Sequence, residues 1–416
     1  MGLMPETVVL RGRVVLPSEV LDDGVVVATG DRLTFVGTVP DAVTAGLGDL
    51  VAVVPASSAV VLPGLVDLHN HGGGGVSFPD VLTADEALVA VHEHRRHGTT
   101  TLLASLVSAS RETLLARAAV LAVLAEAGEI AGIHAEGPFL SYERRGAHNP
   151  ADLVPGDAGL VRELAAAARG HLRTMTIAPE VPGVLGTGGA AEALVEAGAV
   201  PSLGHTDGTT EQAEELVAQV VAGLAERAHG RPGTARELTA THLFNGMRPL
   251  HHRAPGPVAA CLAAAARGEM VVELIGDGVH LDPATVRTVF RTVGADHVVL
   301  VTDAMAAAGM ADGAYELGPM SVTVRDGVAR VTDPEDPDGG PIAGGTAHLL
   351  DVVRCAVGAG VPLADAVRAA TTVPARVLGL AGELGALAPG LRADVLVTDG
   401  DLHPVRVLRG GVDVIG

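Results

Sequence analysis

The sequence lacks several features that would place it in common functional classes. Only two of its 416 residues are cysteines, Cys261 and Cys355, so neither a disulfide framework nor a thiolate metal cluster is available. The formal net charge is −21 without any run rich in lysine or arginine, which argues against nucleic acid as a partner. The longest apolar runs, such as residues 118–125, are far shorter than a membrane span, and no cationic flank with an apolar stretch opens the chain. We therefore expect a cytoplasmic protein with no membrane partner.

The middle of the chain repeats one pattern. A short aliphatic or β-branched run ends in polar residues and is followed by an alanine- and leucine-rich stretch typical of a helix. Eight such units predict an α/β fold, a (β/α)8 TIM-type barrel, because eight parallel strands that alternate with helices close into a barrel. The expected strands are residues 60–69, 99–107, 130–136, 172–178, 200–205, 238–243, 270–275 and 298–302.

The two ends of the chain have a different pattern. Residues 7–54 and 393–415 contain short β-rich runs, with Asp-Gly and Thr-Gly turn signals in the first segment. We expect both termini to pair into a small β-sandwich beside the barrel. The predicted domains are this sandwich, residues 1–58 and 384–416, and the barrel, residues 59–383. Within the barrel, residues 315–332 predict a hairpin and residues 333–341 a surface loop.

A pair of histidines gives the first functional signal. His69 and His71 lie one residue apart at the end of an expected strand, and alternate residues of a strand face the same side. This is the spacing of metal ligands, although two solvated histidines would show the same pattern.

Polar residues also end the other expected strands. They include Glu136, His205, His242, the 277–280 run and Asp303. In a barrel of this type the carboxyl ends of the strands form the active site, so we expect four histidines and two carboxylates to converge there. Imidazole and carboxylate ligands suit Zn²⁺ or a similar divalent ion, which predicts metal-assisted hydrolysis. Asp303 is placed to transfer a proton as general acid and base, and the alternative is a supporting metal ligand.

Several motifs together resemble one known family. The sequence is similar to the amidohydrolase superfamily and, within it, to the N-acetylglucosamine-6-phosphate deacetylases, over nearly the whole chain. Similarity to the superfamily alone would need only the histidines and Asp303. The Glu-Gly-Pro and Asn-Gly-Met elements narrow the match to amino-sugar phosphate deacetylases. The motifs that carry the resemblance are Pro63-Gly64-Leu65-Val66-Asp67, the run 134–139, Gly146-Ala147-His148-Asn149-Pro150, Ala178-Pro179-Glu180, Gly204-His205-Thr206, the run 241–247, Asp277-Gly278-Val279-His280, Val301-Thr302-Asp303-Ala304, the run 385–390 and Ala393-Asp394.

The resemblance implies a set of metal ligands and a reaction. Glu136, His205 and His242 would hold a divalent metal, Zn²⁺ first and Fe²⁺ or another ion as alternatives, that polarises an acetamide carbonyl. His69 and His71 match the pair that holds a second metal in some members, with Glu136 as the bridging ligand, so one or two ions are expected. The implied reaction converts N-acetyl-D-glucosamine 6-phosphate to D-glucosamine 6-phosphate and acetate, with Asp303 as acid and base.

The resemblance also implies contacts to the sugar phosphate. Arg253 matches an arginine that reaches the neighbouring subunit's substrate in a homodimer. The sequence departs from the family pattern at two positions. Ala254 stands where the family has an acidic residue before the proline, and Gly345 stands where the family has serine. The implied substrate-binding residues are Ala147, His148, Asn245, Gly246, Arg253, His280, Ile342, Ala343 and Gly344.

Two rival functions remain open at this level. Another amidohydrolase activity on the same barrel, such as a cyclic-amide hydrolase or a nucleobase deaminase, would need no phosphate and no Arg253. A non-catalytic binding protein would be expected to have lost Asp303 or a metal ligand, and the sequence retains all of them. The galactosamine epimer of the sugar is a third alternative within the deacetylase reaction.

Overall fold

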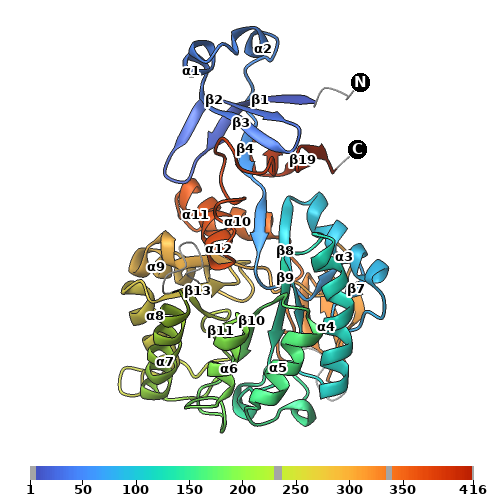
Figure 1. Cartoon of the computed structure of the whole chain (residues 1–416), viewed down its shortest axis with the longest axis vertical. Helices are drawn as coiled ribbons and strands as arrows, with labels where there is room; N and C mark the ends of the chain where they lie inside the picture. Colours follow the sequence, from blue (N-terminus) through green and yellow to red (C-terminus); the bar gives the residue numbers. More distant parts are fainter. Residues whose placement is uncertain (1–5, 229–236, 334–339, 415–416) are drawn as a thin grey trace.

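The chain folds into a barrel of parallel strands with a separate sheet at one end, and this sheet carries both termini (Figure 1). The structure is a computed structural model that describes residues 6–228, 237–333 and 340–414. In these ranges, no helix combines the length and the apolar character that a membrane crossing requires.

Eight parallel strands form the barrel, as predicted. They lie side by side in chain order from β5 to β14. The circle closes where the first and last strands end, because Asp303 N donates to His69 O at 2.9 Å and His71 N donates to Ala304 O at 2.7 Å. The strands are β5 (Leu65–Asp67), β8 (Thr99–Leu106), β9 (Gly132–Glu136), β10 (Leu172–Ile177), β11 (Val200–Leu203), β12 (Leu238–Ala240), β13 (Met270–Leu274) and β14 (Val298–Leu300).

The first expected strand is interrupted, which corrects the prediction of one strand over residues 60–69. Its first half, β4 (Val60–Pro63), belongs to the terminal sheet, and only β5 enters the barrel. Gly64 separates the two halves. A Cβ atom added there would lie 2.2 Å from Thr100 Oγ1, so this crossing needs a residue without a side chain.

Helices cover the outside of the barrel. Side-chain caps fix several of their first turns, as where Thr83 and Glu86 form a reciprocal capping box at the start of α3. The buried leucines and alanines of α3 to α11 pack against the strands in one continuous core, whereas the buried residues of α12 pack with strand residues such as Val66 and Val299 in a second core. The helices are α3 (Ala84–Arg96), α4 (Arg111–Glu126), α5 (Ala158–Ala167), α6 (Ala190–Ala197), α7 (Thr210–Ala228), α8 (Gly256–Ala266), α9 (Pro283–Val293), α10 (Leu349–Gly358), α11 (Leu363–Ala369) and α12 (Thr372–Val377).

The two termini pair, as expected, and their strands share one seven-stranded sheet. Buried valines and leucines from both ends, including Val14, Val26 and Val395, pack together, and the short helices α1 (Val39–Thr44) and α2 (Gly48–Ala52) lie at its far end in Figure 1. In spatial order the strands are β20 (Val412–Asp413), β19 (Pro404–Arg409), β18 (Val395–Thr398), β4, β1 (Thr7–Val15), β2 (Val20–Thr29) and β3 (Arg32–Thr38).

Two small sheets are inserted into the loops of the barrel. The expected hairpin is a three-stranded sheet of β15 (Gly313–Leu317), β16 (Met320–Arg325) and β17 (Val328–Val331). Residues 334–339 of the loop predicted after it lie outside the described ranges. The second pair, β6 (Gly72–Gly73) and β7 (Val76–Ser77), follows His69 and His71, which lie in the segment after β5. Three single-turn segments complete the fold: η1 (Tyr142–Arg144), η2 (Pro150–Asp152) and η3 (Ala295–His297).

Candidate active site

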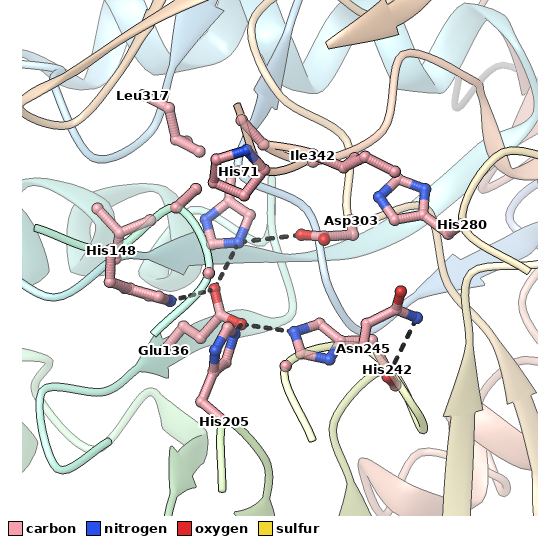
Figure 2. A pocket seen from close by; sticks show the side chains of 17 residues that line it. His71, Glu136, His148, His205, His242, Asn245, His280, Asp303, Leu317 and Ile342 are labelled. Carbon is pink, nitrogen blue, oxygen red and sulfur yellow. Dashed lines mark hydrogen bonds and ion pairs between the residues drawn. The ribbon is translucent and has the colours of Figure 1, made fainter. Parts of the chain in front are cut away.

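A cavity of about 280 Å³ opens at the carboxyl ends of the barrel strands. Its walls come from loops that follow β5, β8, β9, β11, β12, β13 and β14, and from the inserted sheet, which contributes Leu317. Figure 2 shows these side chains pointing toward one another from several elements. A space of this size suits a small molecule.

The carboxylate of Glu136 lies at the centre of this cavity. Its Oε1 atom is 2.9 Å from His205 Nε2 and 2.8 Å from His242 Nε2. Its Oε2 atom is 3.1 Å from His71 Nε2 and 3.4 Å from His148 Nε2 (Figure 2). Four imidazoles from different parts of the chain therefore surround one carboxylate that is only 4% exposed.

The other predicted ligands complete a second group beside Glu136. His69 Nε2 is 2.9 Å from His71 Nε2, and each of these atoms is 3.2 Å from Asp303 Oδ1. His69 is fully buried and is not among the side chains that line the open cavity, so it lies beneath His71. One ligand atom from each of His69, His71, Glu136 and Asp303 falls within 4.8 Å of the others.

The electrostatics of the group favour ionised carboxylates. Burial by itself raises the pKa of Glu136, but the neighbouring histidines, led by His69, outweigh burial and hold this pKa well below its usual range. Burial also opposes ionisation of Asp303, and His69 and His71 again prevail, so its pKa is lowered. Both carboxylates are therefore in the ionised form, which is the form that binds a cation.

These residues fit a divalent metal. Two ligands of a tetrahedral ion at about 2.0–2.1 Å lie about 3.3–3.4 Å apart, which is close to the separations of 2.8–3.4 Å between Glu136 oxygens and the four imidazoles. His69 and His71 also face each other with two nitrogens, of which only one can donate if both rings are neutral. The other nitrogen then accepts that hydrogen bond, whereas a bound cation would use both nitrogens as ligands.

The backbone is strained where the site is built. His205, His242 and Asp303 have φ values of 46°, 28° and 48°, in the left-handed region that residues other than glycine seldom occupy. Each stands just after a barrel strand, where the chain turns outward. Such conformations cluster at active sites, where surrounding structure holds them.

Comparison with known proteins identifies the family. The Amidohydrolase family model matches residues 60–413 of the sequence. This chain belongs to the amidohydrolase family. The resemblance predicted from the sequence is confirmed. The chain is a metal-dependent hydrolase that acts on amides, as predicted.

Named relatives of this amidohydrolase are sugar-phosphate deacetylases. It is 30% identical to the N-acetylglucosamine-6-phosphate deacetylase of Bacillus subtilis, over 87% of this chain and 86% of that protein. It is 33% identical to the N-acetylgalactosamine-6-phosphate deacetylase of Escherichia coli O157:H7, over 85% of this chain and 87% of that protein. A solved structure of the Mycobacterium smegmatis N-acetyl-D-glucosamine-6-phosphate deacetylase is also similar; it holds a mutant in complex with N-acetyl-D-glucosamine-6-phosphate. Its sequence identity to this chain is 39% and its TM-score is 0.84, over 99% of this chain and 100% of that chain.

Two buried carboxylates of the amidohydrolase support the histidines and were missed by the sequence prediction. Glu273 Oε2 lies 3.5 Å from His69 Nδ1 and accepts a hydrogen bond from His242 N at 3.3 Å. Asp67 accepts from Thr302 Oγ1 at 2.6 Å, and burial raises its pKa to about 6. The available signal was an acidic residue inside an otherwise apolar strand, as in Met270–Leu274.

Most predicted substrate contacts of the amidohydrolase line the cavity. Ala147, His148, Asn245, Gly246, His280 and residues 342–344 all do so. Gly246 has a φ of 59°, and a Cβ atom added to it would lie 2.7 Å from His205 Nδ1, so only glycine fits beside this ring. Val107 and Leu317 also line the cavity, and no sequence motif marked them.

His280 has a carboxylate partner. Its Nδ1 atom is 2.8 Å from Asp277 Oδ2, while Asp277 Oδ1 accepts from the backbone N–H groups of Val279 and His280. Burial lowers the pKa of His280, but the hydrogen bond and charge of Asp277 outweigh it, so this pKa is raised. The cavity therefore holds a histidine that favours its cationic form.

Arg253 differs from the other predicted contacts of the amidohydrolase. Its side chain is exposed and is not among those that line the cavity of its own chain.

Proposed function

We propose that this amidohydrolase hydrolyses the acetamide of N-acetyl-D-glucosamine 6-phosphate to D-glucosamine 6-phosphate and acetate. The observation that carries the proposal is the convergence of His71, Glu136, His205, His242 and Asp303 on one small cavity, with His69 beneath His71. The Mycobacterium smegmatis structure supports the substrate, because it is named as the corresponding deacetylase and contains that sugar phosphate.

We assign the ligands as follows. Glu136, His205 and His242 would hold one divalent ion, and His69 and His71 would hold a second that shares Glu136. Zn²⁺ fits the imidazole and carboxylate donors best, and Fe²⁺ is the principal alternative. When bound, such an ion polarises a carbonyl oxygen and lowers the pKa of water to about 7.

Asp303 carries the proton in this proposal. Its carboxylate has a lowered pKa and is therefore ionised at neutral pH, ready to accept a proton from the attacking water. The same oxygen atoms then return the proton to the amide nitrogen, which leaves as an amine.

The remaining cavity residues orient the substrate. His280 in its cationic form and the Asn245-Gly246 segment would bind the phosphate and the hydroxyls, and His148 and Ala147 would lie against the sugar. The wall at residues 342–344 would face the acetyl group. Arg253 does not line the cavity of its own chain, and in the proposed homodimer it would reach the substrate of the neighbouring subunit.

Acetate release tests this function. The purified protein is incubated with N-acetylglucosamine 6-phosphate, N-acetylgalactosamine 6-phosphate and unphosphorylated N-acetylglucosamine, and kcat/KM is compared. We expect the first to be the best substrate and the third the poorest. The 33% identical galactosamine relative makes the second compound the relevant competitor. Equal activity on the third compound would contradict recognition of the phosphate.

A further inference from the structure

A cleft outside the active site lies between the end of helix α3 and the C-terminal strands β19 and β20. Its volume is about 680 Å³, and it shares no lining residue with the active-site cavity. Arg95 and Arg96 of α3, Arg409 of β19 and Asp413 of β20 line it, together with His92, Val412 and Val414. The cleft therefore lies where the barrel meets the terminal sheet, whose strand β19 is labelled above α3 in Figure 1.

The charge of this cleft is opposite to that of the whole chain. The chain has 28 lysines and arginines against 49 acidic residues, but three arginines and one aspartate line the cleft. That aspartate, Asp413, is already held by Arg406, whose Nε and Nη2 atoms lie 2.7 and 2.6 Å from its two oxygens. The three cleft arginines, Arg95, Arg96 and Arg409, are therefore in excess over the acidic side chains that line it.

Two of these arginines have donors that the chain does not use. Glu129 Oε2 accepts from Arg95 Nη2 at 2.6 Å, but it lies 3.8 Å from Arg409 Nη1, beyond hydrogen-bond distance. The other donors of Arg409 bind only the carbonyls of Thr100 and Gly128. Arg95 is 8% exposed, yet in the described ranges its Nε atom has no hydrogen-bond partner. Because buried donors are nearly always paired, Arg95 has binding capacity beyond its contacts within the chain.

The positive charges also act on one another. Burial lowers the pKa of Arg409, and the charges of Arg95 and Arg392 lower it further. Burial and then Arg95 lower the pKa of His92, so its ring is neutral at pH 7 and can form hydrogen bonds without adding charge. An anion in the cleft would offset the repulsion between the guanidinium groups.

We propose that the cleft binds a phosphate dianion, either free or as the phosphate group of a small metabolite. Guanidinium groups bind phosphate oxygens through paired N–H donors, so several arginines can share one phosphate. The side chains of Arg96 and Arg409 are 57% and 24% exposed, which leaves both accessible to a solute. Val412 and Val414 offer apolar surface to the carbon part of a phosphate ester. The ligand would join α3 of the barrel to β19 of the terminal sheet and so stabilise their junction.

A crystal soaked in tungstate locates the site without any variant. Tungstate is a tetrahedral dianion like phosphate, and its anomalous scattering marks its position. We expect a peak between Arg95, Arg96 and Arg409, separate from any peak beside Glu136. A map with tungstate only in the active-site cavity, or only at arginines outside the cleft, would overturn the proposal.

Calorimetric titration at constant ionic strength tests binding in solution. Inorganic phosphate is titrated into the metal-loaded wild type, Arg96→Gln, Arg409→Gln and the control Arg162→Gln. Arg162 lies on α5, and its side chain is 58% exposed, which matches Arg96. Loss of a hydrogen bond to a charged group predicts affinity lower by about 10-fold for Arg409→Gln and by less for the more exposed Arg96. The control should match the wild type, and KM for acetate release should be unchanged in Arg96→Gln. Equal affinities in all four proteins would refute the site.

The same titrations with glucose 6-phosphate and glucose distinguish the two sources of the phosphate. The readout is the difference between the wild type and Arg96→Gln. A larger difference with glucose 6-phosphate than with inorganic phosphate would identify a phosphorylated metabolite, and an equal difference would identify free phosphate. An equal difference with unphosphorylated glucose would contradict recognition of an anion. Sedimentation that shows a dimer dissociated by Arg96→Gln, with no phosphate bound, would overturn the proposal and assign the cleft to a second copy of the chain.

Discussion

Replacing Asp277 with asparagine should shift the pH dependence of substrate binding. Asp277 Oδ2 lies 2.8 Å from His280 Nδ1, and His280 lines the cavity where an anionic sugar phosphate is proposed to bind. Asparagine keeps an oxygen for the backbone N–H groups of Val279 and His280, so the local turn is retained. It removes the charge that keeps His280 protonated, leaving Asp303 as the other anion that favours its cation.

The size of the shift follows from the bond that is lost. A hydrogen bond to a charged group contributes about 1.5–3 kcal/mol, and one pKa unit corresponds to about 1.4 kcal/mol, so the pKa of His280 should fall by about 1 to 2. In the wild type, KM should rise as the pH increases through the raised pKa of His280, because the cation is lost. In Asp277→Asn the same rise should begin at a pH lower by about 1 to 2.

The assay is KM measured across pH 6–9, with kcat recorded at each point. The second ionisation of the substrate phosphate is common to both proteins and cancels in the comparison. Asp282→Asn serves as a control, since Asp282 is an exposed acidic residue that caps the next helix through Ala284 N. Superimposable KM profiles for the wild type and Asp277→Asn would refute the reasoning, and a shift in Asp282→Asn would show a long-range charge effect.

The same pair predicts a pH window for stability. The pKa of Asp277 is lowered from 3.8, so its contribution is present above that value and is lost as the pH falls through the folded pKa. The pKa of His280 is raised from 6.5, so its contribution is present below that value and is lost as the pH rises through the folded pKa. Urea unfolding should therefore show the largest destabilisation by Asp277→Asn between about pH 4 and 6.5.

Three further predictions concern the proposed catalytic roles. Asp303→Asn should lower kcat by at least about 10²-fold with little change in KM, and steady-state kinetics that show near-normal kcat would move the proton-transfer role elsewhere. His205→Gln should reduce both bound metal and turnover, whereas His69→Gln should lower metal content by about one ion per chain if two are bound; unchanged metal analyses would contradict the ligand assignment. Mixed dimers of Asp303→Asn and Arg253→Ala should recover about a quarter of wild-type activity if Arg253 acts across the interface, because one site of each mixed dimer is intact. Verified mixed dimers without recovery would place Arg253 in its own subunit's site.

Much of the metal group could be predicted because barrel geometry places strand ends together. His69 and His71 follow the strand β5, Glu136 is the last residue of β9, and His242 and Asp303 follow β12 and β14 at the same end of the barrel. No tertiary information beyond the strand count was needed to bring them near one another. Their detailed pairing, such as which imidazole meets which oxygen of Glu136, depends on side-chain rotation and could not be read from spacing.

Other features depend on contacts between distant segments. Leu317 reaches the cavity because the inserted sheet folds back over the barrel, and no local pattern encodes that return. The need for glycine at position 64 follows from the close approach of Thr100, which is 36 positions away. His348 Nε2 lies 3.1 Å from Glu93 Oε1, which is 255 positions away, so this contact also follows from closure of the barrel.

The left-handed backbone at His205, His242 and Asp303 has a consequence for engineering. A residue other than glycine in such a conformation costs about 1–3 kcal/mol, comparable to the effect of many stabilising mutations. In the metal-free protein, glycine at any of these positions would relieve that strain while removing a functional side chain. A library screened only for heat resistance would thus enrich inactive proteins, so it should hold these three codons constant.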